Sequence, residues 1–160
     1  MTEATLLYLV KDDKVLLMEK QKKLGAGKLN GVGGKKEPGD KSITDTMIRE
    51  SIEEMGITPT EYRKMAEIVF HNPGEDKTLA DMHVHIFVSK RWSGEPTATD
   101  EMKKPQWFDI DNLPFDKTLP DDKFWLPLVL DGKKVIGEFT FNDDWTIADY
   151  VINEVENFDE

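Results

Sequence analysis

Runs of apolar residues separated by polar clusters predict a series of β-strands. Apolar side chains dominate residues 5–10 and 15–18, and the polar residues 11–14 between them predict a hairpin turn. In the segment 82–89, apolar side chains alternate with the side chains between them, which predicts a half-buried strand. Other strands are expected at residues 64–71, 106–110 and 134–141, whereas 146–155 fits either a strand or a helix.

Two segments predict helices. The first runs over residues 42–55, with Ser42 as the N-cap, Asp45 as a possible capping-box partner and Gly56 as the stop. Its apolar stripe contains Ile43, Met47 and Ile48. The second helix is expected over residues 121–130, and the glycine-rich stretch 24–34 is interpreted as a functional loop. No repeat or linker divides this mixed α/β pattern, so one domain is expected over residues 1–160.

Composition narrows the possible functions. The chain has 32 acidic and 21 basic residues and a net charge of -11, which argues against nucleic-acid and anionic-membrane binding. It has no cysteine, which excludes disulfides, thiolate metal sites and a cysteine nucleophile. Neither a signal peptide nor a membrane span is recognisable, so a soluble, cytoplasmic protein is expected. A bound metal must use oxygen or imidazole ligands.

The chemistry concentrates on the first predicted helix. Glu50 and Glu54 are four residues apart and share one face, and Glu53 lies beside them. These like charges repel each other, and a divalent cation reverses that interaction, since Mg²⁺ prefers carboxylate oxygens. Arg49 stands four residues before Glu53, where it can pair with it or orient a ligand carboxylate. By itself, such a patch is also compatible with a solvated, charge-rich helical face.

The residues around this helix extend the pattern. Gly33-Gly34 lie upstream, Asp40 follows, and Arg49 to Gly56 is followed by Ile57. Together they resemble the Nudix box, which reads G, five residues, E, seven residues, R-E-U-x-E-E-x-G-U, where U is a bulky apolar residue. The chain departs from it in three ways: Asp40 replaces the Glu, eight residues separate it from Arg49, and Ser51 takes the first apolar position. The extra residue is expected in the turn between 39 and 42, where an insertion does not rotate the helix face that carries the glutamates.

This resemblance implies an α/β Nudix fold, an α/β/α sandwich with a mixed central sheet and a loop-helix-loop metal site. It implies Mg²⁺, with Mn²⁺ as a possible substitute, and attack of water on a nucleoside diphosphate linked to another group. Glu50 and Glu54 are then expected metal ligands, with the carbonyl of Gly34 as an additional one. Glu53 is either a further ligand or the base that activates water. The remaining implied residues are Glu101 and Lys20. Glu101 matches an acidic residue near the metal that either completes the metal coordination or activates water, and Lys20 either contacts a phosphate or is solvated.

A longer resemblance concerns the substrate. The loop 25–34, the strands 68–70 and 84–87, and the segments 100–102, 107–108 and 120–125 occur in the order found in animal-type oxidised purine nucleoside triphosphatases, the 8-oxo-dGTPases. That similarity implies a small nucleotide substrate, with Asn30, Asp121 and Asp122 reading the purine edge. The local sequence equally allows Asp121 and Asp122 to cap the following helix.

Three leucines depart from this second pattern. Leu119 stands where the family has a base-stacking aromatic residue, and Leu24 and Leu29 stand where Phe and Trp are common. Leucine replaces stacking only by nonspecific apolar contact, so purine affinity or selectivity is expected to differ. Phe70 and Trp125 are candidate pocket walls or ordinary core residues.

The implied reaction is hydrolysis of an oxidised purine triphosphate to the monophosphate and pyrophosphate, which would cleanse the nucleotide pool. The alternatives are a Nudix hydrolase of another nucleotide, such as an ordinary dNTP, ADP-ribose or a dinucleoside polyphosphate, and a non-enzymatic nucleotide sensor. Either a monomer or a homodimer is compatible with the sequence. His83 and His85 share one strand face, but no third ligand is evident nearby, which favours strand residues over a zinc site.

Overall fold

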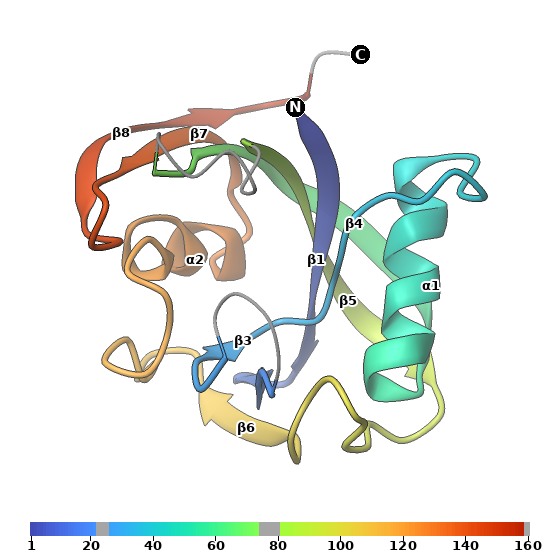
Figure 1. Cartoon of the computed structure of the whole chain (residues 1–160). Helices are drawn as coiled ribbons and strands as arrows, with labels where there is room; N and C mark the ends of the chain where they lie inside the picture. Colours follow the sequence, from blue (N-terminus) through green and yellow to red (C-terminus); the bar gives the residue numbers. More distant parts are fainter. Residues whose placement is uncertain (22–25, 74–80, 159–160) are drawn as a thin grey trace.

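The structure, a computed structural model, describes residues 1–21, 26–73 and 81–158 and arranges them around one mixed β-sheet (Figure 1). Its elements are β1 (Thr2–Lys11), β2 (Lys14–Glu19), β3 (Leu29–Asn30), α1 (Ile43–Met55), β4 (Thr58–His71), β5 (Met82–Ser93), β6 (Gln106–Asp109), α2 (Asp122–Leu130), β7 (Lys134–Phe141) and β8 (Ile147–Val155). Among these residues, no helix is long and apolar enough to cross a membrane.

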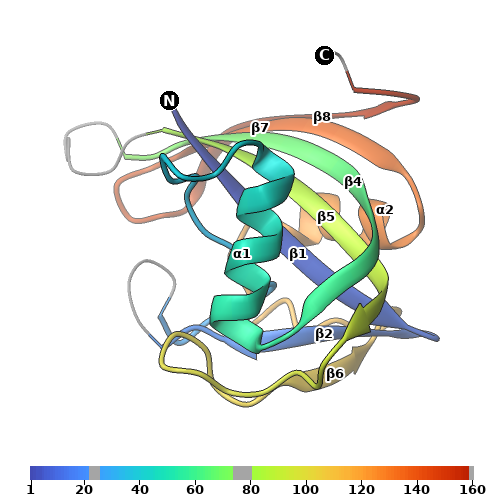
Figure 2. The ribbon, with the colours of Figure 1, turned by 90° about the vertical axis from the view of Figure 1, so that its right-hand side faces the viewer.

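The strands follow the order β3-β2-β1-β5-β4-β7-β8, and β6 pairs with β2. The β1–β5 and β4–β7 pairs are parallel, whereas β5 pairs with β4, and β7 with β8, in antiparallel fashion. Helices α1 and α2 lie on opposite sides of the sheet, as Figure 1 shows, and Figure 2 shows α1 in front of β1, β4 and β5. The mixed sheet between helices confirms the expected sandwich.

Each helix covers its own apolar core. Met47 and Met55 of α1 pack with Leu7, Leu9 and Phe87 on one face. On the other face, α2 contributes Trp125, Leu126 and Val129 to a cluster with Ile68 and Phe139. Because side chains alternate along a strand, the odd-numbered residues of β1 and β5 face α1 and the even-numbered ones face α2. This alternation decides which polar residues can meet on each side.

Local capping fixes the limits of α1. The Ser42 hydroxyl accepts the Asp45 N–H at 3.2 Å, and Gly56 ends the helix with φ of 75°. The Asp45 carboxylate accepts from the N–H of Lys41, so the capping box is displaced by one residue. These findings confirm the predicted Ser42 N-cap and Gly56 stop.

The face that α1 turns toward the core follows the Nudix-box positions rather than the hydropathy of the individual residues. Ser51, at the first apolar position, is fully buried and donates to the Met47 carbonyl at 2.7 Å, whereas Ile52 is 50% exposed. The Ser51 hydroxyl therefore makes its hydrogen bond within the helix, and Ser51 can face the core.

Several element limits differ from the sequence prediction. The glycine-rich stretch is not loop throughout, because Leu29 and Asn30 form β3 against β2. Strand β4 starts at Thr58, and its exposed first half hides the alternation, with bulges where it pairs with β5. Strand β5 likewise continues to Ser93. Residues 147–155 are a strand, paired with β7 at the sheet edge.

The glycine loop presses directly on β1. Leu7 and Val32 exchange two backbone hydrogen bonds of 2.7 and 3.1 Å, and Thr5 N–H donates to Gly34 O at 2.9 Å. A Cβ on Gly33 would lie 1.8 Å from the Thr5 carbonyl oxygen, and one on Gly31 would lie 2.6 Å from that of Leu7. Only glycine allows backbone to approach this closely.

We therefore predict that Gly33→Ala lowers the free energy of unfolding by about 2 kcal/mol or more, because the added methyl forces the loop away from β1. Gly39→Ala is the matched control, since a Cβ there meets no atom within 4 Å; a change below about 0.5 kcal/mol is expected. Urea denaturation measures both. Equal effects of the two substitutions would contradict the proposed close packing.

Candidate active site

Two glutamates of α1 turn toward the glycine loop. The Glu50 side chain is 12% exposed and Glu54 is buried. Gly33 N–H donates to Glu54 Oε2 at 3.1 Å, and a Cβ on Gly34 would lie 2.5 Å from the Glu50 carboxyl carbon. The loop backbone thus lies against both carboxylates, and the lack of a side chain at Gly34 makes room for Glu50.

Arg49 joins the loop to the helix. Its Nε and Nη2 donate to the two oxygens of Asp40, each at 2.9 Å, and Nη2 also donates to the Lys35 carbonyl at 3.1 Å. Nη1 contacts Glu50 at 2.8 Å and Glu53 at 3.3 Å. Asp40 also accepts from the Thr46 hydroxyl at 2.9 Å. The aspartate therefore reaches Arg49 in spite of the extra residue, and Arg49 orients Glu50.

The carboxylates repel each other electrostatically. Burial, together with the charges of Glu50 and Glu101, raises the pKa of Glu54 to about 7, against the lowering effects of Gly33 N–H and Lys20. Burial also raises the pKa of Glu50, although Arg49 opposes it. A divalent cation would relieve this repulsion, and the oxygen atoms present are those that Mg²⁺ prefers. The donor set fits the expected metal.

Lys20 and Glu101 come close to this site through backbone pairing. Lys20 forms an isolated β-bridge with Met102, and Gln21 N–H donates to the Glu101 carbonyl at 2.9 Å. Both charged groups affect the Glu54 carboxyl. Glu53 differs from its neighbours, since its side chain is 56% exposed and paired with Arg49. The structure thus gathers Glu50, Glu54, Lys20 and Glu101, and leaves Glu53 at the rim.

A second acidic pair is buried at the start of α2. Asp121 and Asp122 are each 2% exposed. Asp121 occupies the N-cap but makes no side-chain capping bond, and instead accepts the Trp125 indole N–H at 2.8 Å. The capping alternative is therefore wrong for Asp121. Burial raises the pKa of both groups, and the neighbouring Asp121 charge also raises that of Asp122. Burial of the two neighbouring carboxyl groups therefore favours the uptake of a proton by the pair.

Asn30 is held beside this pair by a residue that the sequence did not reveal. The Tyr8 hydroxyl donates to Asn30 Oδ1 at 3.1 Å, and Gly31 N–H donates to the same oxygen at 2.9 Å. The Tyr8 ring packs edge-on against Trp125, whose indole donates to Asp121, and burial together with the charges of Asp122 and Asp121 raises the pKa of Tyr8. The one available signal was a tyrosine inside the apolar run 6–10. Both contacts use the Asn30 side-chain oxygen, and no described residue accepts from its amide nitrogen.

The expected pocket walls differ in accessibility. Trp125 is fully buried and supports Asp121, so it is a core residue of the site. Phe70 is half-buried and stacks on Phe139 and Phe141 at centroid distances of 5.7 and 6.0 Å. Leu119 is half-buried, and its carbonyl accepts the Asp122 N–H at 3.2 Å. Leu24 lies outside the described residues.

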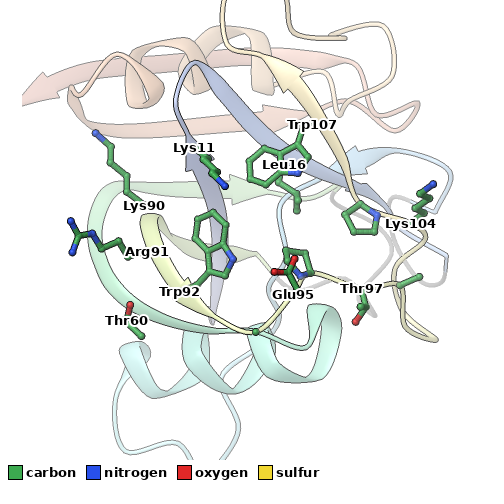
Figure 3. Close-up of a pocket in the computed structure, with 14 residues that line it drawn as sticks. Lys11, Leu16, Thr60, Lys90, Arg91, Trp92, Glu95, Thr97, Lys104 and Trp107 are labelled. Carbon is green, nitrogen blue, oxygen red and sulfur yellow. The ribbon is translucent and has the colours of Figure 1, made fainter.

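A broad hollow of about 940 Å³ lies elsewhere on the surface, and none of the predicted site residues lines it. Figure 3 shows Trp92 and Trp107 in it with several basic side chains. The two indole rings stack at 6.1 Å. It lacks the clustered carboxylates, and so hollow size does not identify the candidate active site here.

Comparison with known proteins agrees with the geometry. The NUDIX domain profile matches residues 2–129. The chain is 40% identical over 154 residues to the Mus musculus protein named oxidized purine nucleoside triphosphate hydrolase, covering 96% of each chain. It is 41% identical to the Danio rerio protein of the same name, covering 96% of this chain and 95% of that one. A Bacillus halodurans MutT crystal structure aligns with a TM-score of 0.80 and 26% identity, covering 96% and 98%.

The Asp40–Arg49 contact predicts a pH-dependent effect on stability. The Arg49 guanidinium holds the pKa of Asp40 well below its usual range, so the charged carboxylate stabilises the fold above the unfolded-state pKa. Asp40→Asn is therefore expected to lower the free energy of unfolding at pH 7. Below about pH 4 that difference should shrink, because Asp40 of the parent protein takes up a proton in the unfolded state there and in the folded state only at lower pH, which favours unfolding. Urea denaturation at several pH values measures it, and a difference that grows on acidification would contradict this role.

Proposed function

This chain belongs to the NUDIX family, and from that membership we propose that it is a Mg²⁺-dependent pyrophosphohydrolase of oxidised purine (deoxy)nucleoside triphosphates. Its substrates would include 8-oxo-dGTP or 2-hydroxy-dATP, and its products the monophosphate and pyrophosphate. The observation that carries the proposal is the short segment 30–34, which has Asn30 at one end and Gly34 at the other. It links the buried Asp121–Asp122 pair to the buried glutamates of α1.

The carboxylate side would hold the polyphosphate through a metal. Glu50, Glu54, Glu101 and the Gly34 carbonyl supply oxygen ligands suited to Mg²⁺, and Mn²⁺ fits the same atoms. A bound divalent ion neutralises charge that develops on the phosphate oxygens and lowers the pKa of water. Arg49 keeps Glu50 in place through the contact of 2.8 Å.

Two further groups border this metal site. Glu53 is partly accessible at the rim, which suits a base that takes a proton from water or an additional ligand. Lys20, on the same side, would contact a phosphate oxygen.

The end of the site that contains the Asp121–Asp122 pair would recognise the base. The Asn30 amide offers N–H donors, Asp122 offers a proton, and Asp121 offers a carboxylate oxygen. Because the two acids can redistribute one proton, the pair can match more than one pattern of donors and acceptors on an oxidised purine. Leu119 would cover the base by apolar contact, and Phe70 would border it.

One observation favours a second candidate, a hydrolase of another nucleotide. Leu119 replaces an aromatic residue that would stack on a base, and the loss of stacking weakens selection of a purine. A pure sensor is less compatible with the site, because binding alone does not require clustered metal ligands.

We predict that the protein hydrolyses 8-oxo-dGTP or 2-hydroxy-dATP with higher kcat/KM than dGTP, ADP-ribose or Ap4A, and only with a divalent cation. Glu54→Gln should lower kcat by at least about 100-fold, since it removes a ligand charge. Glu61→Gln is the control, because Glu61 is exposed on β4. Thermal unfolding verifies that each variant folds. Preference for ADP-ribose would refute the substrate assignment, and an unaffected Glu54→Gln variant would refute the ligand assignment.

Replacing Asp122 by Asn should change base preference, because Asp121 then loses the neighbour with which it exchanges a proton. We expect the ratio of kcat/KM for 8-oxo-dGTP and 2-hydroxy-dATP to change by about tenfold, the value of one buried hydrogen bond. Asp116→Asn, at an exposed position, is the matched control. Steady-state kinetics on both substrates measures the ratio. An identical ratio in the parent and Asp122→Asn proteins would count against base reading by this pair.

A further inference from the structure

Three neighbouring strands bring two histidines and two glutamates together away from the carboxylates of α1. Glu3 lies on β1, His83 and His85 on β5, and Glu67 on β4. In the register of the sheet, Glu3 is opposite His83, and Glu67 is opposite His85. All four face the α1 side of the sheet, as do Leu7 and the other odd-numbered residues of β1 and β5. The sequence showed the histidine pair but not the carboxylates beside it.

The two imidazole rings stand side by side between the two carboxylates. Their centroids are 4.3 Å apart. On one edge, His83 Nδ1 lies 3.1 Å from Glu3 Oε2, and His85 Nε2 lies 2.9 Å from Glu3 Oε1. On the other edge, His83 Nε2 and His85 Nδ1 lie 3.0 and 3.6 Å from Glu67 Oε1. Each carboxylate therefore faces one nitrogen of each ring.

In this arrangement, the ring nitrogens of His85 do not both find a suitable hydrogen-bond partner. The residue is 6% exposed, and its Nδ1 has no hydrogen-bond partner among the residues that the structure describes. A neutral imidazole ring has one N–H and one lone pair. Because both ring nitrogens face carboxylate oxygens, one lone pair must point at negative charge. A cation between His85 and Glu3 removes that conflict and lets the Nδ1 proton point at Glu67.

We propose that Glu3, His83 Nδ1 and His85 Nε2 bind a divalent transition-metal ion, with Zn²⁺ as the best-matched probe. Ligand atoms of these three residues lie within 4.8 Å of one another. Zinc bonds of about 2.0–2.2 Å in a tetrahedron separate ligand atoms by about 3.3–3.6 Å, so small side-chain shifts suffice. Two histidines and one carboxylate form a known zinc ligand set, with a position left for water.

Glu67 completes the site as a positioning residue. Carboxylates that accept the distal N–H of a metal-bound histidine fix the tautomer and the ring orientation. Lys64 Nζ pairs with Glu67 Oε2 at 3.3 Å, which leaves Oε1 toward both rings. Imidazole ligands favour zinc over Mg²⁺, so this site differs in metal preference from the carboxylate site of α1. The proposal does not depend on the substrate of that site.

Calorimetric titration with Zn²⁺ in excess Mg²⁺ tests the proposal, because Mg²⁺ competes for carboxylate sites and not for imidazole. One zinc per chain is expected. His83→Asn and the more conservative Glu3→Gln should each weaken binding by at least about tenfold, and Glu67→Ala by about 10- to 100-fold. His71→Asn is the matched control, since His71 also contacts two carboxylates, Asp81 and Glu138, at another place. Thermal unfolding shows whether each variant is folded.

The ring nitrogens give an independent readout. In ¹⁵N-labelled protein, zinc should shift the His83 Nδ1 and His85 Nε2 resonances and leave His71 unchanged. Two results would overturn the proposal: the absence of saturable zinc binding in excess Mg²⁺, or zinc affinity that persists in folded His83→Asn or Glu3→Gln protein. Zinc affinity lost in His71→Asn would also overturn it, because the ion would then lie elsewhere.

Discussion

The close approach of the glycine loop to two elements at once is the constraint on which the site depends. Backbone at Gly33 touches β1, while Gly34 borders the Glu50 carboxyl group of α1. A side chain at Gly33 would push the loop away from β1, and one at Gly34 would displace the Glu50 carboxylate. Asp40 and Arg49 fix the same arrangement from the other side by a bidentate pair. Packing and charge therefore position the same few atoms.

Buried negative charge is accommodated in two different ways in this molecule. Glu50 and Glu54 suit a divalent cation, because both carboxylates lie against the backbone of Gly33 and Gly34 and can supply oxygen ligands. At Asp121 and Asp122, burial raises the pKa of both carboxyl groups and so favours a pair with a proton over a pair with two charges. The first arrangement suits a polyphosphate, and the second suits recognition of a base with mixed donors and acceptors. The loop 30–34 lies between the two acidic groups and would join them into one elongated substrate site.

The sequence predicted what local interactions decide. Caps at Ser42 and Gly56 defined α1, and glutamate spacing defined its charged face. Contacts between segments that are distant in the sequence could not be predicted in this way. Pairing with β2 makes Leu29 and Asn30 a strand, and the Trp125 indole draws Asp121 away from a capping role. Tyr8 and Glu3 acquire their partners only when β1 lies beside the loop and β5, so neither stood out in the sequence.

A crystal structure with Mg²⁺ and the product 8-oxo-dGMP tests most directly whether the two acidic groups serve one substrate. The account predicts the base against Asn30, Asp121 and Asp122, with the phosphate directed toward Glu50 and Glu54. A base bound elsewhere, such as between Trp92 and Trp107, or a phosphate far from the glutamates of α1, would contradict it.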